Sequence, residues 1–142
     1  MPATAHVRLP TTPAEVAAAA LDGIQNDPSA FEMGNWAWLT LSRQLTPDQA
    51  PACGTTLCAA GWVAHVTGWT IVDLREGEQE VRATSPRGGE YLTHAQVYAE
   101  KDGDRRLICD VAREALGLKE PETFWYGDAD TAIYRLHDIA GR

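Results

Sequence analysis

Two thiols and an imidazole, at Cys53, Cys58 and His65, are the side chains whose types and spacing could do chemistry in this chain. Four residues separate the two cysteines, a spacing that a zinc site tolerates, but no second pair of ligands lies nearby. His65 follows Cys58 by seven residues, which on one helix separates their Cα atoms by about 10.5 Å. Zinc ligands lie within about 2.0–2.3 Å of one ion. The sequence therefore predicts no metal site, and it contains no motif for an organic cofactor.

A reactive cysteine is the second interpretation of the same motif. If Thr55 caps a helix, Cys58 is the third residue of that helix, where the helix N-terminus favours the thiolate. A nucleophile also needs a base, and His94 or His137 could approach through the fold. Cys58 also lies on an apolar stripe, where a buried thiol is inert. A thiol-dependent enzyme that uses Cys58 or Cys53 therefore stays open as an alternative.

The apolar residues of the motif favour a packed helix instead. Thr55 is the expected N-cap and Gly68 the expected left-handed C-cap. Gly61 weakens a helix by about 1 kcal/mol relative to alanine. It lies on a narrow face of small side chains, which would let a neighbouring helix approach closely. Another face of the same helix carries the apolar residues Cys58, Ala59, Trp62, Val63 and Val66. We assign a structural role to Cys53, Gly54, Thr55, Cys58, Gly61 and Trp62.

Three further helices are expected from capping signals and apolar spacing. The segment 12–26 opens with the capping box T-P-A-E and continues as an apolar stripe. The segment 105–118 carries its apolar residues on one face and ends in a Gly-Leu cap. A last helix is expected to begin near Asp128 or Asp130, because an aspartate caps helices well.

Strand signals are confined to one region of the chain. Residues 69–76 and 79–84 alternate or carry β-branched side chains around a Gly-Glu dipeptide, which predicts a two-stranded hairpin. The segment 93–104 is expected to form a short helix or a loop.

These elements together predict a mainly α fold, with four to five helices in one small domain and a short β-hairpin. Residues 1–11 are expected to form a flexible N-terminal arm, and residues 12–142 a single globular domain. The aromatic segment 31–39 predicts a short helix or an irregular plug. The five tryptophans are expected in the core, because their neighbours in the chain are neutral or acidic.

Charge and composition argue against several function classes. Twelve basic and twenty acidic residues give a formal net charge of −8, so direct nucleic-acid binding is not expected. The apolar stretch 14–24 is too short to span a membrane and carries Glu15 and Asp22. Three cysteines are too few for a secreted disulfide scaffold. No targeting segment is visible, so we expect a cytoplasmic protein without a membrane role.

The lack of a complete catalytic set favours a non-enzymatic protein that presents a binding surface. The charged, least patterned region 73–106 is the expected surface, because loops on a rigid scaffold commonly carry recognition. Its exposed arginines, Arg87, Arg105 and Arg106, are the expected partner-binding residues. An acidic mimic that blocks a nucleic-acid-binding protein is a further alternative. The arginines interleaved with the carboxylates argue against it, since mimicry needs an uninterrupted negative surface.

The stretch "CGTTLCAAGW", from Cys53 to Trp62, resembles the C-G-T-x-x-C-x-A-G-W signature of small uncharacterised proteins of actinobacteria and their phages. The flanks "LDGIQNDPSAFEMGNW" and "AREALGL…FWYGDADTAIYRLHDIA" are similar to the flanks in that group. The resemblance implies a soluble phage or bacterial accessory protein and no catalytic residues. Our leading hypothesis is a non-enzymatic binding module that acts on a bacterial protein during phage growth or host defence.

Overall fold

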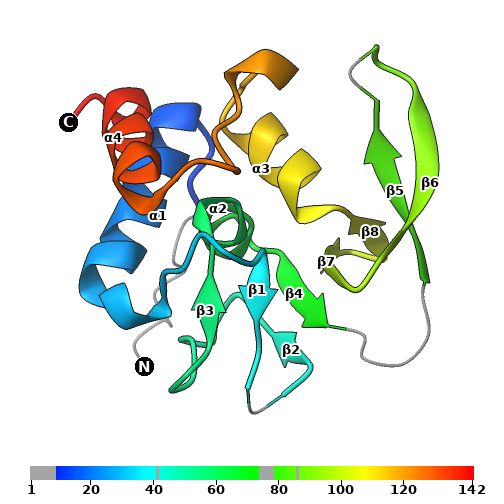
Figure 1. Ribbon diagram of the computed structural model, residues 1–142, viewed down its shortest axis with the longest axis horizontal. Helices are drawn as coiled ribbons and strands as arrows, with labels where there is room; N and C mark the ends of the chain where they lie inside the picture. Colours follow the sequence, from blue (N-terminus) through cyan, green and yellow to red (C-terminus); the bar gives the residue numbers. More distant parts are fainter. Residues whose placement is uncertain (1–8, 41, 74–78, 86) are drawn as a thin grey trace, which may run out of the picture.

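The computed structural model describes residues 9–40, 42–73, 79–85 and 87–142, and Figure 1 shows how their elements are arranged. Within these residues the chain forms four α-helices and eight strands in two sheets. The mainly α prediction is therefore wrong, and the fold is α+β with a sizeable sheet. The helices are α1 (Pro13–Asn26), α2 (Ala59–Val66), α3 (Ile108–Ala115) and α4 (Ala129–Ala140), with the 3₁₀-helices η1 (Pro28–Ala30) and η2 (Glu120–Glu122).

The strands form one two-stranded sheet, β1-β3, and one six-stranded sheet in the order β2-β4-β7-β8-β5-β6. Neighbouring strands run antiparallel, except β5 and β8, which run parallel. The strands are β1 (Ala37–Trp38), β2 (Gln44–Leu45), β3 (Thr56–Leu57), β4 (Thr70–Asp73), β5 (Gln79–Thr84), β6 (Glu90–Ala95), β7 (Val97–Lys101) and β8 (Asp104–Arg106). Strand β6 therefore lies at one edge of the larger sheet.

The hairpin predicted within residues 69–84 is wrong in its pairing. Both strands exist, but β4 pairs with β2 and β7, whereas β5 pairs with β6 and β8. The Gly-Glu dipeptide expected at the turn lies outside the described residues. The helix or loop expected at 93–104 is also wrong, because β7 lies between β4 and β8 and its Tyr98 is fully buried. Pairing with distant strands decides the structure of this segment, and no local pattern reports it.

The helix boundaries expected at Thr12, Asp128 and Gly117 are confirmed, but the helix expected over 105–118 begins only at Ile108, because Asp104–Arg106 form β8. The Thr12 hydroxyl accepts a hydrogen bond from the Glu15 amide at 3.2 Å, and Pro13 is the first residue of α1. Asp128 caps α4, because its carboxylate accepts from the Thr131 amide at 2.8 Å. Gly117 has a φ of +65° and ends α3. Most of the flexible arm predicted for residues 1–11 lies outside the described residues.

The helix that contains the end of the stretch Cys53–Trp62 begins later than predicted. Thr55 is not the N-cap, since Thr56 and Leu57 form β3 and pair with β1. Cys58 is the N-cap instead, and its Sγ accepts a hydrogen bond from the Gly61 amide at 3.4 Å. The predicted left-handed glycine at the other end is confirmed: Gly68 has a φ of +94°, and the amide after it donates to Ala64 at 3.1 Å.

The main core lies between the helices and the short strands beneath them. Helix α1 packs against α4 and α2, and α2 packs against α3 (Figure 1). Helices α1 and α2 meet at Gly23, where a Cβ atom would lie 2.5 Å from the ring of Trp62. The Trp62 indole donates to the Ala30 carbonyl at 3.1 Å, which fixes the ring in this position. A second, smaller cluster inside the larger sheet contains Val72, Val81 and Tyr98.

None of the described helices has the length and apolar character needed to cross a membrane.

Candidate binding cleft

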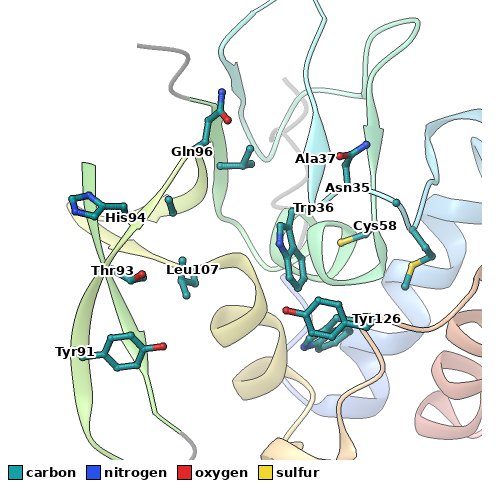
Figure 2. A pocket seen from close by; sticks show the side chains of 15 residues that line it. Asn35, Trp36, Ala37, Cys58, Tyr91, Thr93, His94, Gln96, Leu107 and Tyr126 are labelled. Carbon is teal, nitrogen blue, oxygen red and sulfur yellow. The ribbon is translucent and has the colours of Figure 1, made fainter. Parts of the chain in front are cut away.

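A cleft of about 500 Å³ lies between the edge of the larger sheet and the segment that precedes β1. One wall is formed by Tyr91 and residues 93–97, the other by residues 33–37 and 125–126. Leu107 and Cys58 also line it, and Figure 2 shows these side chains from close by. None of the described residues that line the cleft is Asp, Glu, Lys or Arg. A cleft of this size and composition suits an uncharged ligand, because its wall holds no carboxylate, lysine or arginine to pair with a charge buried there.

Four Trp and Tyr residues line the cleft, and Trp36, Tyr91 and Tyr126 are the ones among them that are not buried. Trp36 and Tyr126 meet edge to face, with ring centroids 5.8 Å apart and an interplanar angle of 77°. Tyr126 is 90% exposed and Tyr91 is 51% exposed. In Figure 2 Tyr91 extends into the cleft from β6, and Tyr126 extends into it from the opposite wall. Exposed aromatic rings that converge on one cleft are typical of a recognition surface, since they bury much area at a small cost in side-chain entropy.

The cysteine motif positions the wall that carries Trp36. The Trp36 carbonyl accepts a hydrogen bond from the Cys58 amide at 3.2 Å. A Cβ atom on Gly61 would lie 2.7 Å from that carbonyl oxygen. The close approach predicted at Gly61 is confirmed, but the neighbour is the backbone at Trp36, together with Leu57, and not another helix. Gly61 is needed because α2 and this strand segment share the space that a methyl group would fill.

The environment of Cys58 opposes thiol chemistry. Its side chain is 1% exposed, and burial raises its pKa to about 11, against the smaller opposing effect of hydrogen bonds from the Gly61 and Ala60 amides. His94 lies on the opposite wall of the cleft (Figure 2). Within the described part of the chain, no hydrogen bond joins the Cys58 sulfur to a histidine. Cys58 therefore lines the cleft as a neutral, structural thiol.

The other cysteines also differ from a catalytic or metal-binding set. Cys53 is exposed, outside the residues that line the cleft, and its carbonyl accepts from the Thr40 hydroxyl at 3.0 Å. Cys109 is half-buried, and burial, with the nearby Asp110 carboxylate, raises its pKa to about 11. All three thiols are free. Among the described residues no group of three or more His, Cys, Asp or Glu side chains could hold a metal ion.

The three arginines predicted to contact a partner lie in different environments. Arg87 is exposed on the turn between β5 and β6. Arg105 lies 4.4 Å above the ring of Tyr98 and forms an ion pair with Glu100 at 3.4 Å. Arg106 donates two hydrogen bonds to the Glu114 carboxylate, and its side chain is only 12% exposed. Partner contact through these residues stays a prediction, with Arg87 the most accessible of them.

The aromatic residues of the cleft are absent from the site predicted from sequence. The tryptophans were expected in the core, which holds for Trp62 and Trp125, whereas Trp38 is 59% exposed. The signal that could have revealed β6 is the Gly-Gly turn at 88–89 between two short segments that carry the β-favouring residues Val81, Thr84, Tyr91 and Thr93. No comparable signal brings Trp36 and Tyr126 together, because their contact depends on the packing of distant segments.

The chain matches no protein-family model, and no curated protein or solved structure is significantly similar to it.

Proposed function

We propose that this protein is a non-enzymatic protein-binding module, and that the aromatic cleft is its recognition surface. The observation that carries the proposal is the cleft itself: it has a volume of about 500 Å³ and is lined by Trp36, Tyr91 and Tyr126, with no Asp, Glu, Lys or Arg among the described lining residues. Aromatic side chains in a desolvated pocket contribute most of the binding energy at many interfaces. Leaving Tyr126 90% exposed has no evident benefit for folding, because an exposed ring contributes little to the core.

A protein partner fits the charge distribution better than a nucleic acid does. The chain has a formal net charge of −8, and the described cleft residues include no lysine or arginine to contact phosphate. An acidic mimic is disfavoured for a second reason. Arginines neutralise carboxylates across the larger sheet, with Arg82 and Asp104 3.0 Å apart and Arg106 bound to Glu114. This surface therefore lacks the continuous negative field of a nucleic-acid mimic.

The partner we propose is a bacterial protein, in phage growth or host defence. The resemblance of the stretch Cys53–Trp62 to a motif of small actinobacterial and phage proteins supports this proposal. The thiol-dependent enzyme is the remaining alternative, because Cys58 does line the cleft. Its burial and raised pKa argue against that alternative.

Site-specific photocrosslinking tests the proposal with a matched control. A benzophenone amino acid replaces Tyr126 in one protein and Tyr134 in another. Tyr134 is a suitable control because it is 70% exposed on α4 and does not line the cleft. In bacterial lysate we expect a discrete polypeptide adduct from position 126 and none from position 134, and mass spectrometry identifies the polypeptide.

The identified polypeptide is then purified and its affinity measured directly. Trp36→Ala and Tyr126→Ala should each weaken binding by about tenfold or more, the loss typical of an interface hot spot. Cys58→Ser should leave the affinity unchanged. Equal crosslinking from positions 126 and 134 would contradict the proposal. Loss of the biological effect in Cys58→Ser, with stability and affinity intact, would favour the thiol enzyme.

A further inference from the structure

Strand β6 is a regular edge strand without the features that usually block pairing with another chain. In the described part of the chain it pairs with β5 and with no other strand, and Figure 1 shows it on the outer side of a hairpin that stands away from the helices. Its six pairs with β5 are consecutive, without a bulge, and its sequence EYLTHA contains neither proline nor lysine. The opposite edge strand, β2, has only two residues. Short strands, bulges, proline and lysine protect the edge of a sheet, and β6 has none of them.

The phase of the pairing decides which residues of β6 direct their backbone toward the open edge. Successive residues of an antiparallel strand direct their N–H and C=O groups alternately toward the partner strand and away from it. Arg82 of β5 pairs with Leu92, and its carbonyl accepts a hydrogen bond from the Leu107 amide at 3.4 Å, on the side of β8. The two residues therefore form a non-hydrogen-bonded pair, in which both face outward. Leu92 and, two residues to either side, Glu90 and His94 direct their backbone groups toward the open edge.

The side chains of these three exposed residues are complementary to a second copy of the same strand. Two copies of β6 can pair antiparallel around a two-fold axis at Leu92, so that each Leu92 lies opposite its counterpart and Glu90 lies opposite His94. All three residues direct their backbone groups to the edge, so this register makes them hydrogen-bonded pairs. Leu92 is 64% exposed, and in the paired strands its side chain contacts its counterpart. The Glu90 carboxylate faces an imidazole, which can donate a hydrogen bond to it.

The other face of β6 fits the same register. Tyr91 and Thr93 direct their side chains to that face, and each lies opposite the other in the two copies. An aromatic and a β-branched side chain make a favourable cross-strand pair. A two-fold axis at Glu90 would instead place two carboxylates directly opposite each other, which destabilises a strand pair. The side chains of β6 therefore favour the register centred on Leu92.

We infer that the protein forms a symmetric dimer in which the β6 edges of two copies pair and join the two larger sheets. The same surface is used on both copies, so the contact closes and does not propagate into a fibre. The inference goes beyond the proposed function and does not depend on it.

The dimer has a consequence for the aromatic cleft. Tyr91 and Thr93 line the cleft, and a two-fold axis perpendicular to the sheet leaves them on the same face in both copies. The two clefts therefore open on one face of the joined sheet. A dimer of this kind binds a partner with two suitably spaced sites more tightly than a single copy does.

Sedimentation equilibrium of the full chain over a concentration series measures the dimer. We expect a dissociation constant of about 1–100 μM for the wild-type protein, because the contact is small. Leu92→Lys places two like charges opposite each other at the two-fold axis and should weaken the dimer about tenfold or more. Tyr134→Lys is the matched control, because Tyr134 is 70% exposed on α4, and it should dimerise as the wild type does. Urea denaturation shows whether each variant is folded.

Disulfide formation tests the register. Cys53→Ser first removes the exposed native thiol, and Leu92→Cys is then compared with Glu90→Cys in this background. Residues 92 of the two copies form a hydrogen-bonded pair with Cα atoms about 5.5 Å apart, a distance that a disulfide spans. Residues 90 of the two copies lie about 13 Å apart along the strands, too far for a disulfide. Under mild oxidation Leu92→Cys should therefore form a covalent dimer about tenfold faster than Glu90→Cys, or more.

The inference is overturned by a wild-type protein that stays monomeric at about 1 mM, or by a dimer that a folded Leu92→Lys variant does not weaken. It is also overturned if Glu90→Cys oxidises to a covalent dimer as fast as Leu92→Cys. If Leu92→Lys is unfolded, the two cysteine variants decide by themselves. Photocrosslinking from position 126 tests the proposed function separately, because a bacterial polypeptide captured there supports the proposed function whether or not β6 pairs with a second copy.

Discussion

Replacement of Gly61 by alanine tests how the cysteine motif supports the cleft. The new Cβ atom would lie 2.7 Å from the Trp36 carbonyl oxygen and 3.2 Å from the Leu57 Cβ atom. The first contact is shorter than real side chains make, and it is made with backbone. The segment at Trp36 can relieve it only by moving away from α2, which weakens the 3.2 Å hydrogen bond between the Cys58 amide and that carbonyl.

The size of the effect follows from three terms. Overpacking a dense core costs about 1–3 kcal/mol, and the weakened hydrogen bond costs about 1 kcal/mol. Alanine returns about 1 kcal/mol, because it is the better helix former. The free energy of unfolding should therefore fall by about 1–3 kcal/mol. In a chain of 142 residues each kcal/mol lowers the Tm by about 4 °C, so we expect a decrease of about 4–12 °C.

Urea denaturation followed by tryptophan fluorescence, with a thermal scan alongside, measures the change. Gly89→Ala is the matched control, because the nearest atom to a Cβ there is the Ser85 hydroxyl oxygen at 3.7 Å. Its free energy of unfolding should change by less than about 0.5 kcal/mol. A Gly61→Ala protein as stable as wild type would refute the argument that α2 and the Trp36 segment share this space.

Three further predictions concern thiols, pH and ion pairs. Iodoacetamide should label the exposed Cys53 in the native protein and should not label Cys58, which is 1% exposed and has its pKa raised to about 11 by burial. Peptide mass spectrometry measures the labelling, and rapid labelling of Cys58 would support the thiol-enzyme alternative. Burial lowers the pKa of His65 from 6.5, so its contribution to stability is complete above about pH 6.5 and is lost as the pH falls through the folded pKa. The urea midpoint of the wild-type protein should therefore decrease as the pH falls below about 6.5, and this decrease should be smaller in His65→Gln. The same pH dependence of the midpoint in both proteins would contradict the prediction. Arg106→Ala should lower the free energy of unfolding by about 1 kcal/mol, because the Arg106 side chain is 12% exposed and is bound to the half-exposed Glu114 carboxylate. Arg87→Ala should leave the free energy of unfolding unchanged in the same urea titration. Equal effects of the two substitutions would mean that the ion pair does not stabilise the protein.

The sequence alone determined where α1 and α4 begin and where α3 ends. The caps at Thr12, Asp128 and Gly117 act within one turn of the residue concerned, and a helix satisfies its own hydrogen bonds over four residues. The sequence also predicted that a neighbour approaches closely at Gly61, because glycine weakens a helix and only close packing would offset that loss of stability. The sequence could not say which neighbour would approach it.

The tertiary structure decided the sheet and the cleft. A strand needs another chain segment for its hydrogen bonds. Strand β4 pairs with β2 and with β7, and β7 follows the β5–β6 hairpin in the chain. For the same reason Thr56 and Leu57 form β3, because they pair with β1. The helix therefore begins after them, and Cys58 is its N-cap instead of a residue within the helix. The cleft combines Trp36, Tyr91 and Tyr126, which come from three separate segments. Their meeting is fixed by non-local pairing and packing, which local propensity does not encode.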